Sequence, residues 1–162
     1  MTISAIDPDR FRELMGRFAT GVTVVTTTAP DGNPVGMTAN SLTSVSLEPP
    51  LLSLCVSHGA DIHGALSTAG GFVVNVLAHD QESLSRRFAE SGDDRFEGLE
   101  HRPGANGHPI LGGCLAHVEC HLFGTFPAGD HTVFLGQVIS GDTSDGHPLL
   151  YYRGGYASLD DR

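Results

Sequence analysis

A mainly β, antiparallel fold with a few flanking short helices is the architecture that this sequence predicts. Runs rich in β-branched residues recur along the chain, and segments rich in Gly, Pro, Asp and Asn separate them. Few segments have the apolar spacing of a helix. Many short antiparallel strands favour a closed barrel, because closure removes the strand edges that invite aggregation. Periodicity alone does not distinguish a barrel from a sandwich.

The first predicted element is a helix near the start of the chain. Asp7 is its expected cap and Pro8 its first residue. Gly21 is expected to end it. The apolar side chains in between follow at i, i+3, i+4 and i+7 and share one face, which joins either the core or a subunit interface: Phe11, Leu14, Met15 and Phe18.

The next elements are a hairpin and a series of strands. Residues 22–28 predict a strand, 29–33 a tight turn and 34–39 the returning strand. Residues 91–113 are rich in Gly, Pro and charge and predict a long loop, a kind of segment that often acts as a lid or a partner surface. Further strands are expected at 51–57, 72–77, 114–126, 132–140 and 149–156, and short helices at 62–68 and 80–90.

Size and charge limit the functions that are open to the chain. Its 162 residues and 17.0 kDa fit one domain, 1–162, with a core from about residue 11 to 156. The net charge is −10, and the nine basic residues, all arginines, form no run longer than a pair, which argues against nucleic acid as a partner. An anionic cofactor must therefore be held by local amides, hydroxyls or arginines.

The cysteines and the apolar runs indicate a reduced, cytoplasmic setting. Cys55, Cys114 and Cys120 are an odd number, and the segment that begins with Met1 has no signal-peptide pattern. No apolar run approaches the roughly 18 to 20 residues that cross a bilayer, so no membrane association is expected.

A zinc site is suggested by two thiols and two imidazoles that lie close together, but strand geometry argues against it. On a strand, His117 and His121 would stand roughly 13 Å apart at about 3.3 Å per residue, too far to share one ion. No metal is therefore expected, and Cys120 is predicted to be a core residue. The residues concerned are Cys114, His117, Cys120 and His121.

Three other catalytic motifs are missing. The sequence contains no GxSxG nucleophile elbow, no GxGxxG after the first strand and, since it has no lysine, no GxxxxGK[ST] loop. Hydrolase, Rossmann and P-loop interpretations therefore have no motif to support them.

The segment 36–56, GMTANSLTSVSLEPPLLSLCV, is the strongest candidate for a ligand site. Small side chains at Thr38, Ala39, Asn40 and Ser41 leave backbone N–H groups open to a flat polar ligand. The alternative is an ordinary polar turn before a buried strand.

Two further candidates lie later in the chain. The turn that contains Gly129, Asp130 and His131 would hold an imidazole at a barrel rim, or be a solvent-exposed turn. Arg87 and Phe88 follow Arg86 on a predicted helix, where the arginines face either a ligand or water and Phe88 either a ligand or the core.

Five segments in order together resemble the flavin reductase family built on the FMN-binding split barrel. The resemblance covers residues 11–156 and is strongest to small reductases that supply reduced flavin to two-component monooxygenases. It implies an antiparallel, Greek-key split β-barrel. The segments are RFATGVTVVTT, GMTANSLTSVSLEPPLLSLCV, GFVVNVLAHDQESLSRRFA, GDHTVFLGQV and PLLYYRGGY.

The resemblance also implies roles for single residues. His131 would orient the nicotinamide beside the flavin ring, and Arg87 would lie near phosphate oxygens. Relatives carry a basic residue or more serines where this chain has SHGADIH, which leaves the roles of His58 and His63 open. The residues expected to contact the flavin are Met37, Thr38, Ala39, Asn40, Ser41, Cys55, Val56, Ser57, Arg87, Phe88, Gly129 and Tyr156.

The implied activity is hydride transfer from NADH or NADPH to FMN or FAD. The implied assembly is a homodimer that supplies reduced flavin to a separate monooxygenase. Two alternatives remain open at this point: a non-enzymatic flavin or haem binding protein on the same barrel, and an oxidoreductase with permanently bound flavin.

Overall fold

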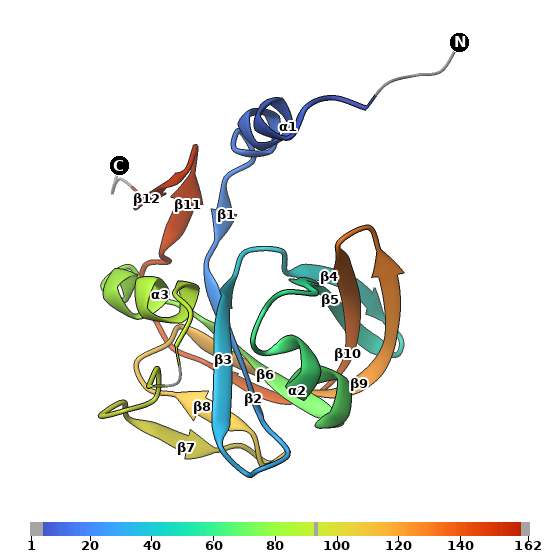
Figure 1. Ribbon diagram of the computed structural model, residues 1–162. Helices are drawn as coiled ribbons and strands as arrows, with labels where there is room; N and C mark the ends of the chain where they lie inside the picture. Colours follow the sequence, from blue (N-terminus) through green and yellow to red (C-terminus); the bar gives the residue numbers. More distant parts are fainter. Residues whose placement is uncertain (1–4, 93, 160–162) are drawn as a thin grey trace.

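A seven-stranded antiparallel sheet dominates the molecule in the computed structural model, which describes residues 5–92 and 94–159 (Figure 1). Its strands are hydrogen-bonded in the order β3-β2-β6-β9-β10-β5-β4. The mainly β, antiparallel class is therefore confirmed. The strands are β2 (Thr23–Thr28), β3 (Pro34–Ala39), β4 (Thr43–Leu47), β5 (Pro50–Ser57), β6 (Gly71–Val76), β9 (Ala116–Ala128) and β10 (His131–Thr143).

The sheet curls around the first of two hydrophobic clusters, and the second contains Leu77 and Phe88. Val25, Leu54, Phe72, Cys120 and Phe134 come from five of its strands and are almost completely buried together. Helix α2 (His63–Thr68) lies against the open side of the curl, and the chain passes through it from β5 to β6, so the strands do not follow a simple up-and-down order (Figure 1). The edge strands β3 and β4 are consecutive in the chain, and within the described residues no ladder joins them. The barrel is split along this side.

The first helix begins as predicted but ends earlier. In α1 (Pro8–Met15), Asp7 Oδ1 accepts hydrogen bonds from the N–H groups of Asp9 and Arg10 at 2.9 and 3.2 Å. The prediction that Gly21 ends the helix was wrong. Gly21 belongs to β1 (Thr20–Gly21), which pairs with a strand near the C-terminus, so tertiary pairing takes over these residues.

The apolar face of α1 is not part of the core of this chain. Phe11, Leu14, Met15 and Phe18 are all exposed, and no residue of α1 is buried. Of the two alternatives that the spacing left open, only the subunit interface remains, and it stays a prediction.

The C-terminal strand predicted at 149–156 is instead a hairpin of β11 (Leu150–Tyr152) and β12 (Gly155–Ala157). The chain reverses at Arg153 and Gly154, whose φ angles are 54° and 79°. Two consecutive positive φ angles are typical of the tight turns that join hairpin strands. The expected single strand was therefore wrong at its centre.

The segment 91–113 contains more structure than the predicted loop. It forms a small sheet of β7 (His101–Pro103) and β8 (Pro109–Leu111), held by buried polar contacts to the main sheet. Asn75 Oδ1 accepts from the N–H of Leu111 at 2.9 Å, and Thr26 Oγ1 donates to the carbonyl of Pro109 at 2.5 Å. These contacts involve residues far apart in sequence, which is why the local pattern did not indicate them.

Candidate functional site

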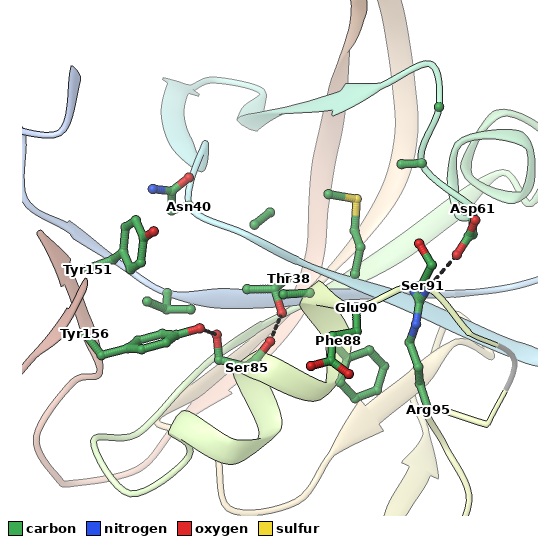
Figure 2. A pocket seen from close by; sticks show the side chains of 16 residues that line it. Thr38, Asn40, Asp61, Ser85, Phe88, Glu90, Ser91, Arg95, Tyr151 and Tyr156 are labelled. Atoms are coloured by element: carbon green, nitrogen blue, oxygen red, sulfur yellow. Dashed lines mark hydrogen bonds and ion pairs between the residues drawn. The ribbon is translucent and has the colours of Figure 1, made fainter. Parts of the chain in front are cut away.

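A cavity of about 360 Å³ lies beside β3 (Figure 2). Helix α3 (Glu82–Ala89), the β11–β12 hairpin and the loop after β5 surround it. The volume of this cavity falls within the range typical of small-molecule sites. Its lining residues are Val22, Met37, Thr38, Ala39, Asn40, Gly59, Ala60, Asp61, Ser85, Phe88, Ala89, Glu90, Ser91, Arg95, Tyr151 and Tyr156.

One end of the cavity is aromatic and hydrogen-bonded. The hydroxyl oxygens of Tyr156 and Ser85 lie 2.8 Å apart, and Thr38 Oγ1 donates to the Ser85 carbonyl at 2.6 Å. The rings of Tyr151 and Tyr156 (Figure 2) meet edge to face. The Arg86 guanidinium lies 4.8 Å from the Tyr156 ring centre. These contacts fix the tyrosine ring of β12 against α3 and β3.

The packing of α3 on β3 forms the side of the cavity. Phe88 is only 1% exposed and meets the Phe96 ring edge to face at 5.1 Å. A Cβ atom at Gly36 would lie 2.7 Å from Phe88 Cε1, so the close approach of helix and strand requires glycine there. Phe88 is therefore buried in the interior and also forms part of the cavity wall. Its position agrees with both alternatives that the sequence left open, the core and a ligand.

The other end of the cavity is charged. Arg95 forms an ion pair with Asp61 (Figure 2). Its Nη1 donates to the Gly36 carbonyl at 2.7 Å. The Arg95 side chain is 12% exposed, and its Nε is shielded from solvent without a hydrogen-bond partner among the described residues. Sequence reasoning missed Arg95, because a single arginine in a polar loop gives no local signal.

Several predicted flavin contacts do come together in this cavity. Four of these residues belong to β3 or directly follow it, one belongs to α3 and one to β12. The predicted residues that line the cavity are Met37, Thr38, Ala39, Asn40, Phe88 and Tyr156.

Other predicted contacts lie outside this cavity. Ser41 Oγ contacts β5, where it accepts a hydrogen bond from the Cys55 N–H at 3.0 Å and lies 3.2 Å from the Cys55 carbonyl. Val56 has its side chain fully buried in the core. Arg87 Nη2 donates to the backbone carbonyls of Asp94 and Glu97 at 3.0 and 2.5 Å, so it secures the loop that carries Arg95.

Gly129, His131 and Ser57 form a rim next to the cavity. His131 pairs with Ser57 across β10 and β5, and Gly129, with φ 64°, turns the chain just before it. His131 Nδ1 lies 2.7 Å from Asp130 Oδ1, and this hydrogen bond holds the pKa of the Asp130 carboxyl below its usual value. The His58 N–H donates to the Asp130 carbonyl, which ties the rim to the loop that lines the cavity.

His58 and His63, whose roles the sequence left open, pack below this rim. Their rings meet edge to face at 5.3 Å, and His63 also meets the Phe134 ring at 5.6 Å. His63 Nε2 lies 2.9 Å from Thr132 Oγ1. These contacts give both imidazoles a packing role beside the loop after β5.

The environments of Cys114 and Cys120 disfavour a reactive thiolate. Burial raises the pKa of Cys120 to about 12 and that of Cys114 to about 11. Cys120 is fully buried, which confirms its prediction as a core residue. In residues 5–92 and 94–159, no three His, Cys, Asp or Glu side chains are grouped to hold a metal ion. No helix there is long and apolar enough to cross a membrane.

Comparison with known proteins decides the family. A model of the flavin reductase like domain matches residues 15–160. The chain belongs to the flavin reductase-like family.

Similar proteins cover nearly the whole chain. It is 43% identical over 157 residues to the flavin-dependent monooxygenase reductase subunit HsaB of Rhodococcus jostii, covering 96% of this chain and 80% of HsaB. A probable flavin reductase of Rhizobium meliloti is 42% identical over 156 residues, but the alignment spans only 50% of that longer protein and 96% of this chain. The solved structure of the NADH:FAD oxidoreductase SgcE6 of Streptomyces globisporus, with NAD and FAD fragments, superposes with a TM-score of 0.90 at 38% identity, covering 98% of both chains.

The family resemblance is therefore confirmed, and with it the split-barrel class and the flavin reductase class of enzyme. The Greek-key connection implied by the resemblance agrees with the crossing from β5 to β6.

Proposed function

We propose that this flavin reductase uses NADH to reduce FMN or FAD in the cavity beside β3. The observation that carries this proposal is the convergence of six predicted flavin contacts on one cavity in a chain of this family. HsaB is the reductase subunit of a flavin-dependent monooxygenase, and SgcE6 is an NADH:FAD oxidoreductase. These relatives support NADH as the hydride donor and a flavin as the acceptor. The alternative of a non-enzymatic binding protein has less support, because these relatives are named as enzymes.

The chemistry of the cavity lining fits a flavin. It has an aromatic end at Tyr151 and Tyr156 and a cationic side chain, Arg95, at the other. Between them, Thr38 and Asn40 supply polar side chains, and the small Ala39 leaves the backbone accessible. A flat ring with a polar, phosphate-bearing tail matches this order of aromatic, polar and charged groups.

The protein's contribution is position and electrostatics. The nicotinamide C4 gives a hydride to flavin N5, and the cofactors supply this chemistry themselves. Tyr156 and Phe88 fix the walls of the cavity, while His131 at the rim orients the nicotinamide. Holding donor and acceptor about 3 to 3.5 Å apart makes the transfer effectively unimolecular. No side chain is needed as a general base.

The assembly and the partner follow from the same proposal. HsaB is the reductase subunit of a flavin-dependent monooxygenase, so reduced flavin from this chain would pass to a separate oxygenase. The exposed apolar face of α1 would be covered in a homodimer. A cytoplasmic location agrees with three cysteines that form no disulfide.

Steady-state turnover tests this function. Purified protein is mixed under air with NADH or NADPH and with FMN, FAD or riboflavin in turn, and the loss of NADH absorbance is followed. Oxidation that requires added flavin and saturates with it is the expected result. Tight flavin binding without oxidation would support the binding-protein alternative, and a yellow protein active without added flavin would support the permanently bound cofactor.

A further inference from the structure

We propose that Arg95 is the residue by which this enzyme distinguishes phosphorylated flavins from riboflavin. This inference rests on the proposed function, because it assigns the phosphate end of the flavin to the charged end of the cavity. The family resemblance implied Arg87 for that role. The geometry points to Arg95 instead.

Charge is the first reason. Among the described residues that line the cavity, Arg95 is the only arginine or lysine, and Asp61 and Glu90 are acidic. The chain as a whole has net charge −10, so it gives an anion no general attraction. A flavin phosphate in this cavity therefore has one cationic side chain available, and a guanidinium can offer it two parallel hydrogen bonds.

The position of the guanidinium is the second reason. Arg95 and Asp61 lie at the end of the cavity opposite Tyr151 and Tyr156 (Figure 2). A flavin whose ring lies by the tyrosines would extend its ribityl phosphate toward Arg95. Arg87 is committed elsewhere, since its Nη2 already donates to two backbone carbonyls outside the cavity.

The hydrogen bonding of Arg95 is the third reason. The ion pair with Asp61 and the bond to the Gly36 carbonyl use Nη2 and Nη1, while Nε is buried without a partner among the described residues. A buried donor without an acceptor is unfavourable. A guanidinium that turns from Asp61 onto a phosphate exchanges one anionic partner for another that offers more acceptor oxygens, and can satisfy Nε as well.

Asp61 then has a definite effect on specificity. The Asp61 carboxylate competes with the flavin phosphate for Arg95, and it repels the phosphate at close range because both groups are negative. Asp61→Asn should therefore favour FMN and FAD over riboflavin, opposite to the effect of removing Arg95.

The experiment measures the dissociation constants of FMN and riboflavin by flavin fluorescence, together with the KM of each in turnover. In Arg95→Gln, FMN affinity should fall by about tenfold to a hundredfold, as expected for losing charge-assisted hydrogen bonds, while riboflavin affinity changes by less than about twofold. Arg95→Lys should keep part of the preference for FMN. Arg102→Gln, on the exposed strand β7, is the matched control and should change neither constant.

The outcomes separate the possibilities. If Arg95→Gln weakens FMN and riboflavin equally, Arg95 acts only through the Gly36 backbone, and the inference is overturned. Unchanged affinity for both flavins overturns it too. Should Arg95→Gln fail to fold, Asp61→Asn serves as the test. If this variant does not bind FMN more strongly relative to riboflavin than the wild type does, Asp61 does not compete with the phosphate for Arg95, and the inference is overturned. Wild-type protein that binds no flavin would overturn the proposed function itself.

Discussion

The two sides of the barrel mouth differ in what covers them. On the β3 side, α3 and the β11–β12 hairpin pack over the strand and enclose a cavity, with Phe88 almost fully buried in its wall. On the β5–β10 side, no helix or hairpin of residues 5–92 and 94–159 covers the turn that carries His131 in this way, and the His131 side chain is 42% exposed. Both sides hold residues that the sequence indicated for the same ligand.

This difference separates two kinds of functional residue. In the covered cavity, the groups that would contact a ligand also hold the fold together, so a substitution there should affect stability and binding at once. At the open rim, His131 contacts few structural groups, so a substitution should affect turnover alone. The following variants test this separation.

Phe88→Ala should have the largest effect. It removes a buried aromatic ring from between β3 and α3 and should lower the free energy of unfolding by about 3–5 kcal/mol. Flavin affinity should fall with it, because the cavity wall is lost. Urea denaturation with and without FMN measures both. Phe126→Ala, at a 56% exposed position on β9, is the control, and an equal loss there would contradict the comparison.

His131→Ala should act on the reaction instead. Hydride transfer should slow by about tenfold, equivalent to roughly 1.4 kcal/mol in the barrier, with flavin affinity and urea midpoint nearly unchanged. Stopped-flow reduction of flavin by NADH measures the rate apart from binding. Asp130→Asn keeps the imidazole and serves as the comparison variant. A change in flavin affinity larger than the change in rate would place His131 with the cavity residues.

Tyr156→Phe should have a smaller effect on stability. It removes the hydroxyl that lies 2.8 Å from Ser85 Oγ and leaves the ring in place. The expected loss is about 1 kcal/mol, since Ser85 is fully buried and its hydroxyl has no second hydrogen-bond partner in the part of the chain that the structure describes. Tyr152→Phe on the same hairpin is the matched control. Equal urea midpoints for the two variants would show that the hydroxyl contact contributes nothing.

The smallest expected effect is a pH dependence through His108. Burial lowers the pKa of this imidazole, and the nearby His121 lowers it further. The unfolded chain therefore takes up the proton first as pH falls below about 6.5, so the neutral form's contribution to stability is present above that pH and is lost as pH falls toward the folded pKa.

Urea unfolding at a series of pH values tests this dependence. Wild-type stability should decline on acidification more steeply than that of His108→Gln. His101→Gln, on exposed β7, should keep the wild-type slope. Parallel curves for wild type and His108→Gln would remove His108 as the cause.

Much of the sheet could be predicted from local sequence. The β2–β3 hairpin follows from the β-branched run of β2 and the Asp-Gly turn after it, and β5, β6, β9 and β10 lie close to their expected places. The cap at Asp7 and the buried Cys120 were also correct. Each of these signals is contained in a few neighbouring residues.

The short elements could not be predicted in that way. β4, β7 and β8 have three to five residues, too few for a periodic pattern to stand out. Gly21 ended up in β1 because Leu150 pairs with it from the other end of the chain. For Gly21, hydrogen bonds between residues far apart in the sequence determined the secondary structure, and the local propensity did not indicate it.

The sequence by itself determined the family, the strand-rich class and six of the sixteen residues that line the cavity, because each of these signals depends on side chains arranged along local segments. Only the tertiary structure decided which arginine faces that cavity. Arg87, next to Arg86 on α3, donates to carbonyls of the following loop, whereas Arg95 is directed by Asp61 and by the Gly36 carbonyl, both distant in sequence. An ion pair across a fold has no periodicity, so it becomes visible only once the chain has brought its partners together.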